Sequence, residues 1–399
     1  MASYWYDAYQ RVWGDQASAQ QWGNFAPFYK YFVLAPLFQA LSCFGCLAYA
    51  LPVVILMNIS LYGISAFVFY LMVDRLIMNK VIALIALMFY AFSYLAVYLN
   101  ALVLPDSTAL SLAVISTGVV VLTVDFIALI LGGIFLGIAL AAKPFLVGFC
   151  PVFIWFIFLN NNKKGRIARA AIFTLALAVA PMMTIIENNH VSHGELKSLG
   201  AMGGVNFFQG WAKVTRVGRG RGVFSPGATD EPSWKPFNTN VPWKRQEYFY
   251  RLGINAIAKD PCVLFEKIFW FKKFFWGGLG PSLKSPLPGF HQMLPVVKGI
   301  SYGMFICLGG SWFFFRRQKV FKAAVFLFYL LAAFFTTIYA IGMPERRYFL
   351  NIEFLVIALF FFVIDRAVVL YRMYRNEIWG YVLLAVLFIS STIVWGRLP

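Results

Sequence analysis

Long runs of apolar residues, separated by short polar turns, make up most of the chain. Most runs are close to the roughly 20 residues that an α-helix needs to cross the hydrocarbon core of a bilayer, although several are short or nearly fused. The pattern therefore predicts an all-α, polytopic membrane helical bundle of about ten transmembrane helices. The predicted spans are residues 44–74, 79–98, 107–124, 126–142, 144–159, 167–186, 292–314, 320–341, 348–366 and 378–396.

Two segments depart from this pattern. Residues 27–41 are apolar and aromatic and carry Lys30, and their length and flanks suggest a helix lying in the membrane interface as readily as a span. Residues 187–291 are polar and rich in turn residues, and we expect an extracytoplasmic loop that closes with two helices, the second of them interfacial. The predicted organisation is a tail with an interfacial helix (1–43), an N-terminal bundle (44–186), the loop (187–291) and a C-terminal bundle (292–399).

Composition supports a membrane protein. Hydrophobic residues make up 61% of the chain, charged residues only 13%, and the mean hydropathy is +0.73, which is far more apolar than a soluble globular protein. The net charge of +18 could indicate nucleic acid, but the cations lie in short turns and one loop rather than on a soluble basic face. Anionic lipid or a phosphorylated lipid substrate fits better, and no nucleic-acid partner is expected.

The five cysteines are scattered. Only Cys43 and Cys46 are closely spaced, and no second pair completes a metal site. We therefore expect these two residues to be buried and structural, and we predict no metal site.

Lysine and arginine in short turns indicate the orientation, because they collect on the cytoplasmic side of a membrane. Alternating the spans places four cationic turns on one face, which is predicted to be cytoplasmic: Arg75 and Lys80; Lys163, Lys164 and Arg166; Arg316, Arg317 and Lys319; Arg366, Arg372 and Arg375. Asp106, Lys143 and the Arg346-Arg347 turn then fall on the outer face of a plasma (inner) membrane. Cations there do not orient the protein, so Lys143, Arg346 and Arg347 require another role.

Short motifs in a fixed order cover essentially the whole chain. They are Asp7-Ala8-Tyr9, the stretch APFYKYFVLAPLFQAL, a span that ends at Arg75, LNALVLPDS, GIFLGIALAAKPF, NFFQGW and PERRYFL. In this order and on these sides of the membrane, the chain resembles the GT-C superfamily of membrane glycosyltransferases, above all the protein mannosyltransferase and aminoarabinose transferase branch. The resemblance implies transfer of a sugar from a polyprenyl-phosphate donor to a lipid, glycan or protein acceptor. It implies no cofactor, and a divalent metal is compatible with it.

The family places acidic residues in its first and second outer loops. By the match of motifs the first acid falls on Asp7 and the second on Asp106, which the resemblance makes the candidate catalytic residues. Relatives usually begin with a transmembrane helix before the first acid, and many have Asp-Glu where this chain has Asp7-Ala8. Asp15 is therefore the substitute candidate for the first acid. The missing helix leaves two alternatives, a translocated tail or an upstream helix outside this sequence.

The chemistry of sugar transfer explains these residue types. A base must take the proton of the acceptor, and a carboxylate within hydrogen-bond reach can serve; Asp7 is the candidate. The leaving lipid phosphate gains negative charge in the transition state, which fixed cations stabilise, and Lys143, Arg346 and Arg347 are the candidate phosphate-binding residues. Glu353, seven residues after Arg346 and on the same helical face, is a supporting candidate, for a salt bridge to that arginine or for a substrate contact.

Simpler alternatives exist for the site residues, and other classes of protein are alternatives for the function. Asp106 could cap the helix that follows Pro105, and the outer cations could only reach lipid headgroups. An O-antigen ligase-like enzyme with a lipid diphosphate donor would also have many spans, one large outer loop and outer arginines. A transporter or flippase for charged lipids is the alternative outside enzymes, although such proteins typically show internal repeats and this chain shows no convincing one.

Overall fold

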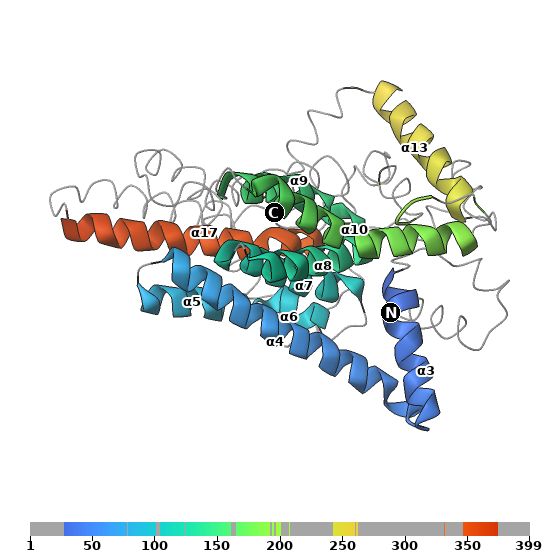
Figure 1. Cartoon of the computed structure of the whole chain (residues 1–399), viewed down its shortest axis with the longest axis horizontal. Helices are drawn as coiled ribbons and strands as arrows, with labels where there is room; N and C mark the ends of the chain where they lie inside the picture. The colour runs from blue at the N-terminus through green and yellow to red at the C-terminus, as the bar shows by residue number, and fades with distance from the viewer. Residues whose placement is uncertain are drawn as a thin grey trace.

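A computed structural model defines the helices around the candidate residues. The described residues are 28–77, 79–100, 104–123, 125–160, 165–191, 194, 197–200, 207, 242–259, 261, 331 and 346–373. Every regular element among them is a helix, which confirms the predicted all-α class for this part of the chain (Figure 1). The elements are η1 (Tyr29–Leu34), α3 (Ala35–Cys43), η2 (Leu47–Tyr49), α4 (Ala50–Leu76), α5 (Lys80–Ala91), α6 (Tyr94–Asn100), α7 (Pro105–Leu122), α8 (Phe126–Ala142), η3 (Pro144–Gly148), α9 (Phe149–Asn160), α10 (Arg166–Val191), α13 (Pro242–Lys259) and α17 (Arg346–Met373).

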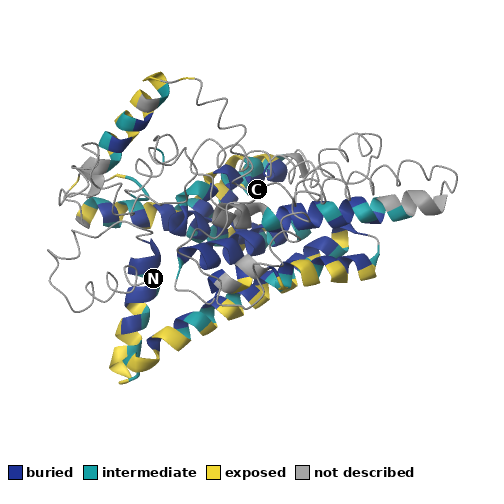
Figure 2. Ribbon diagram, turned by 180° about the vertical axis from the view of Figure 1, so that it is seen from behind, coloured by how far each residue is buried: buried dark blue, intermediate teal, exposed yellow. Residues whose placement is uncertain are grey.

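Three helices of the described part are long and apolar enough to cross a membrane. They are Leu47–Leu76, Pro105–Leu122 and Arg166–His190. Large apolar side chains point outward from two of them: Phe67 on α4 is 62% exposed and Leu175 on α10 is 70% exposed. Such a surface is unfavourable in water but suits lipid. The middle helix, α7, is instead buried along most of its length, and Figure 2 shows this contrast between exposed α4 and the buried centre.

Most predicted spans within the described part have a helical counterpart. The spans 107–124, 126–142, 144–159, 167–186 and 348–366 correspond to α7, α8, α9, α10 and α17, with ends shifted by a few residues. The spans 292–314, 320–341 and 378–396 lie outside the described residues, apart from Leu331. Of the two helices predicted to close the long loop, the first is α13, and the second lies outside the described residues.

Two boundary predictions are wrong. The span 79–98 is not one helix, because it divides into α5 and α6. Ser93 stabilises the break, since its hydroxyl oxygen accepts a hydrogen bond from the N–H of Ala96 at 3.5 Å and so caps α6. The helix predicted over residues 167–186 ends later, since α10 continues to Val191. Polar residues can continue a helix beyond its apolar part, and hydropathy does not reveal where such a helix ends.

α7 and α8 form an antiparallel hairpin. The chain turns between them at residues 123–125, where the Thr123 hydroxyl donates to a carboxylate oxygen of Asp125 at 2.7 Å. Further along, the Ser116 hydroxyl donates to the carbonyl of Gly132 at 2.7 Å. The hairpin therefore brings the end of α8 beside the start of α7. We call this end of the bundle the Asp106 end.

α8 packs between α7 and α10. Gly133 and Gly137 have the G-x-x-x-G spacing that allows two membrane helices to approach closely. A Cβ added at Gly133 would lie 2.7 Å from the carbonyl oxygen of Phe173, and one at Gly137 would lie 2.4 Å from that of Leu177. Real Cβ atoms essentially never approach backbone so closely, so glycine is required at both positions for this packing.

α17 runs antiparallel to α5 and α6. The Ser93 hydroxyl donates to Glu353 Oε2 at 2.8 Å, near the start of α17. Further along α17, Asp365 Oδ1 accepts a hydrogen bond from the N–H of Asn79 at 3.0 Å, next to the start of α5. The first residue of α17, Arg346, therefore lies towards the end of α6, which leads to the start of α7. α17 thus begins at the Asp106 end of the bundle.

The turn between α3 and α4 is exposed. α3 runs across the direction of the bundle helices and meets α4 at an angle (Figure 1). Gly45, with φ of 66°, makes the turn between them, and Phe44 beside it is 80% exposed. The expectation that Cys43 and Cys46 are buried is wrong, because both lie at this turn, Cys43 exposed and Cys46 partly exposed.

Candidate functional site

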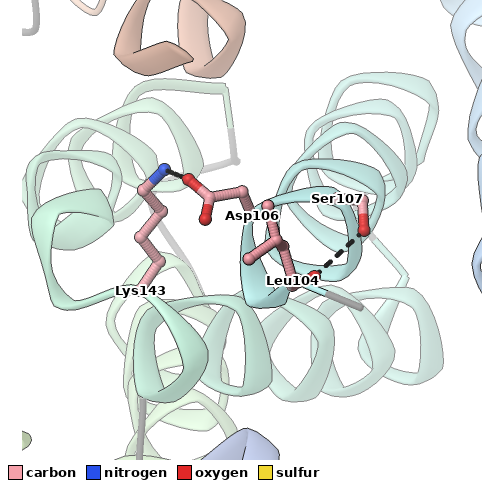
Figure 3. Close-up of polar contacts among 4 residues, drawn as sticks. All are labelled: Leu104, Asp106, Ser107 and Lys143. Atoms are coloured by element: carbon pink, nitrogen blue, oxygen red, sulfur yellow. Dashed lines mark hydrogen bonds and ion pairs between the residues drawn. The ribbon is translucent and has the colours of Figure 1, made fainter. Parts of the chain in front are cut away.

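An ion pair joins two of the predicted site residues. Lys143 Nζ donates to Asp106 Oδ1 across the α7–α8 hairpin (Figure 3). Only 8% of the Lys143 side chain and 11% of the Asp106 side chain are exposed. The structure thus brings the second-loop acid and a predicted phosphate-binding cation into direct contact in a nearly buried place.

Local backbone geometry fixes both partners. Lys143 ends α8, and its N–H still donates to the carbonyl of Ala139 at 2.8 Å. Pro144 disfavours helical geometry at the residue before it, and Lys143 accordingly has φ of −143° and ψ of 89°. Pro105 occupies the first turn of α7, where its missing N–H costs nothing. The two prolines therefore set the helix ends that carry the pair.

Asp106 is not the N-cap residue of α7, so the capping alternative is wrong. Leu104 occupies the N-cap position, and no side chain caps the helix there. Asp106 lies in the first turn, where the helix dipole favours a negative charge. Its carboxylate is turned towards α8 and Lys143 rather than back to the backbone of its own helix (Figure 3).

Stability alone is a weak reason to keep this ion pair. Removing two charges from water costs about as much as their attraction returns, and well-packed apolar residues often replace a buried pair without loss. Ionisable residues inside a membrane bundle are costly, and they usually mark a substrate or ion site. The pair at the Asp106 end is therefore the candidate functional site of the described residues.

Glu353 forms a hydrogen bond with the segment between α5 and α6. Its carboxylate accepts the hydrogen bond from Ser93 at the break between α5 and α6. Because Glu353 lies two turns after Arg346-Arg347, this bond fixes where the arginine turn lies along the bundle. The backbone of both arginines begins α17, while their side chains lie outside the described residues.

Asp7 and Asp15 lie outside the described residues. Of the predicted site, the structure therefore brings Asp106 and Lys143 together and places the start of α17 at the same end. The catalytic and phosphate-binding roles of these residues stay predictions. Among the described residues, no group of histidine, cysteine, aspartate and glutamate side chains could hold a metal ion.

Sequence reasoning missed a second group of polar residues at the Asp106 end. Tyr29 and Lys30 of η1 are completely buried, and Asn58 of α4 is 1% exposed. The Thr108 hydroxyl, two residues after Asp106, donates to Asn58 Oδ1 at 3.1 Å. Asn58 carried a signal, because an amide within an apolar span needs a partner inside the protein. We call Tyr29, Asn58 and Thr108 the η1 cluster.

A third buried group lies nearer the middle of the bundle. The Tyr62 hydroxyl donates to the carbonyl of Tyr90 at 2.5 Å, and the hydroxyls of Ser65 and Tyr90 are 2.9 Å apart. Glu353 is close enough to interact electrostatically with both tyrosines. Each hydroxyl of this network has a partner, so the hydrogen bonds that join α4 to α5 are enough to explain why these buried residues are polar.

No protein-family model, curated protein or solved structure matches this chain. The resemblance to GT-C glycosyltransferases therefore rests on the sequence motifs alone. The structure shows the local geometry: a buried ion pair between Asp106 and Lys143, an arginine-bearing helix that starts at the same end, and the neutral η1 cluster next to α7.

Proposed function

We propose that the chain is a membrane glycosyltransferase that transfers a sugar from a polyprenyl-phosphate donor to a lipid, glycan or protein acceptor. One observation carries this proposal, namely the buried Asp106–Lys143 pair at the end of the bundle where the Arg346-Arg347 helix begins. The site lies on the extracytoplasmic face of a plasma membrane, since the cation-rich turns of the sequence are expected on the other face.

The cations act on the leaving group. The acceptor oxygen attacks the anomeric carbon, the bond from that carbon to the phosphate oxygen breaks, and its electron pair stays on the phosphate. Lys143 and the arginines stabilise this growing charge, and a cation removed from water does so more strongly than an exposed one. Asp106 holds the ammonium group of Lys143 in position before the donor arrives.

The proton of the acceptor needs a separate base. Asp106 is engaged by Lys143, so the carboxylate of Asp7, or of Asp15 in its place, takes the proton as the acceptor attacks. Attack from the face opposite the phosphate inverts the configuration of the sugar.

A transfer assay on the purified chain in lipid nanodiscs tests the proposal. The probes are short-chain prenyl-phosphate hexoses and pentoses with a radiolabelled sugar, offered with native lipid and glycan acceptors. We expect a labelled product, lost in Lys143→Met and strongly reduced in Asp106→Asn. Asp365→Asn is the matched control, because Asp365 is a completely buried carboxylate at the other end of the bundle. It should retain transfer.

Each alternative gives a different result. Transfer only from a prenyl-diphosphate donor, unaffected by Asp106→Asn, would indicate the ligase-like enzyme. Movement of the labelled donor across vesicles without a new glycosidic bond would indicate a flippase. Either outcome would overturn the proposed function.

A further inference from the structure

The η1 cluster lies on the opposite side of α7 from the ion pair. Two residues along an α-helix turn through about 200°, so Asp106 and Thr108 point to opposite sides of the same turn. Asp106 meets Lys143 of α8, and Thr108 meets Asn58 of α4. The start of α7 therefore separates a charged group from a largely neutral one.

Tyr29 supplies a hydroxyl without a hydrogen bond. Tyr29 is completely buried, yet its hydroxyl oxygen has no hydrogen-bond partner among the described residues. Burial raises the pKa of Tyr29 to about 12, and the nearby Asn58 and Thr108 side chains have a smaller, opposite effect on it. The phenol is therefore protonated at neutral pH and available as a donor.

Packing alone does not explain why position 29 carries a tyrosine. A buried hydroxyl without a partner is destabilising, and phenylalanine would fill nearly the same volume without that penalty. Tyr29 also lies in η1, a π-helical segment, and such segments are rare and frequent at functional sites. η1 reaches across the bundle, since neighbouring Phe28 packs with Ala141 of α8 and Ala180 of α10. The position favours a ligand contact over a packing role.

We propose that Tyr29, Asn58 and Thr108 bind hydroxyl groups of the sugar carried by the lipid phosphate, across the first turn of α7 from the Asp106–Lys143 pair. This inference rests on the proposed function and names the part of the donor that this side of α7 recognises. A phenol, an amide and an aliphatic hydroxyl are neutral groups that both donate and accept, which matches sugar hydroxyls. A metal ion would require carboxylates and a phosphate would require cations, and none of these three side chains carries a charge.

Binding measurements with two ligands isolate the sugar contact. The probes are a bare short-chain prenyl phosphate and the same lipid carrying the hexose or pentose that the protein transfers, each titrated into protein in nanodiscs. The ratio of their Kd values measures what the sugar adds. In Tyr29→Phe we expect this ratio to fall about two- to tenfold, the effect of one hydrogen bond, with the Kd of the bare lipid unchanged.

Tyr62→Phe is the matched control. It removes the same hydroxyl from a buried tyrosine, but this one donates to the carbonyl of Tyr90 at 2.5 Å. We expect Tyr62→Phe to lower the Tm and to keep the wild-type ratio of Kd values. Tyr29→Phe should show the reverse, with a Tm equal to or above that of the wild type.

The possible outcomes separate this inference from the proposed function. An unchanged ratio in Tyr29→Phe, with transfer intact in the wild type, overturns the sugar contact alone. An equal loss of affinity for both ligands in Tyr29→Phe would assign the residue to the phosphate and also overturn it. Wild-type protein that neither binds nor transfers any of the sugar-bearing probes overturns the proposed function, and the inference falls with it.

Discussion

Replacing Asp106 and Lys143 singly and together tests whether the buried pair serves stability or chemistry. The variants are Asp106→Leu, Lys143→Met and the double substitution, which keep approximate side-chain volume and remove charge. Because only 8% of the Lys143 side chain and 11% of the Asp106 side chain are exposed, each single variant removes the opposite charge that faces an almost fully desolvated one. We expect each to lose about 3–5 kcal/mol of unfolding free energy.

The double variant should behave differently. Two apolar side chains of similar size avoid the desolvation cost altogether, so we expect stability within about 1–2 kcal/mol of the wild type, or above it. The interaction free energy of the double-mutant cycle should then be several times larger than the roughly 0.5 kcal/mol within which independent substitutions add. Transfer activity, by contrast, should be almost lost in the double variant, because Lys143 no longer faces the leaving phosphate and the arginines remain without it.

Equilibrium unfolding in mixed micelles, followed by the fluorescence of the 12 tryptophans, measures these free energies. Additive losses in the double variant would show that the two residues do not compensate each other's charge, and would refute the structural reasoning. A double variant that is both stable and fully active would leave the pair without a chemical role. The combination of restored stability and lost transfer is the expected result.

Three further predictions concern packing and topology. Gly137→Ala should lose about 1–3 kcal/mol of unfolding free energy, because the added Cβ would lie 2.4 Å from the backbone of α10. Gly63→Ala in α4 is the control and should be neutral or stabilising, because no atom lies within 4 Å of its added Cβ. Equal effects of the two substitutions in unfolding experiments would argue against the α8–α10 contact. Glu353→Gln still accepts the hydrogen bond from Ser93 and should keep most transfer activity, whereas Glu353→Ala should lose both activity and stability; matching losses in the two variants would mean that the charge itself is needed. Cys43 should react with a membrane-impermeant maleimide in intact cells, with the signal absent from Cys43→Ser, and labelling only after permeabilisation would place this turn on the cytoplasmic side.

The proximity of Asp106 and Lys143 could be predicted from the pattern of apolar runs in the sequence. Two apolar runs of similar length joined by a short polar turn predict an antiparallel hairpin, and residues that flank such a hairpin on its open side must lie close together. The side-chain contact itself needed one more fact, the point at which each helix ends. Pro105 and Pro144 supplied it, because proline marks helix ends through local sterics alone.

The contact between Ser93 and Glu353 could not be predicted in the same way. The two residues lie on helices far apart in the chain, and their meeting depends on how α17 packs against α5. The break at Ser93 was also hidden, since the apolar run around it contains neither proline nor glycine. The burial of Lys30 likewise results from tertiary packing of η1, which the pattern of residues 27–41 does not reveal.

The start of α7 connects the two halves of the proposed site. Its N-cap residue, Leu104, offers no side-chain acceptor, so the N–H groups of the first turn keep the partial positive charge of a helix N-terminus. Lys143 lies on one side of this turn and Asn58 with Thr108 on the other. A lipid-linked sugar has the same division, an anionic phosphate joined directly to a neutral ring rich in hydroxyls. A donor placed across the first turn of α7 would meet cations at its phosphate and neutral polar groups at its sugar, and its scissile bond would lie between them.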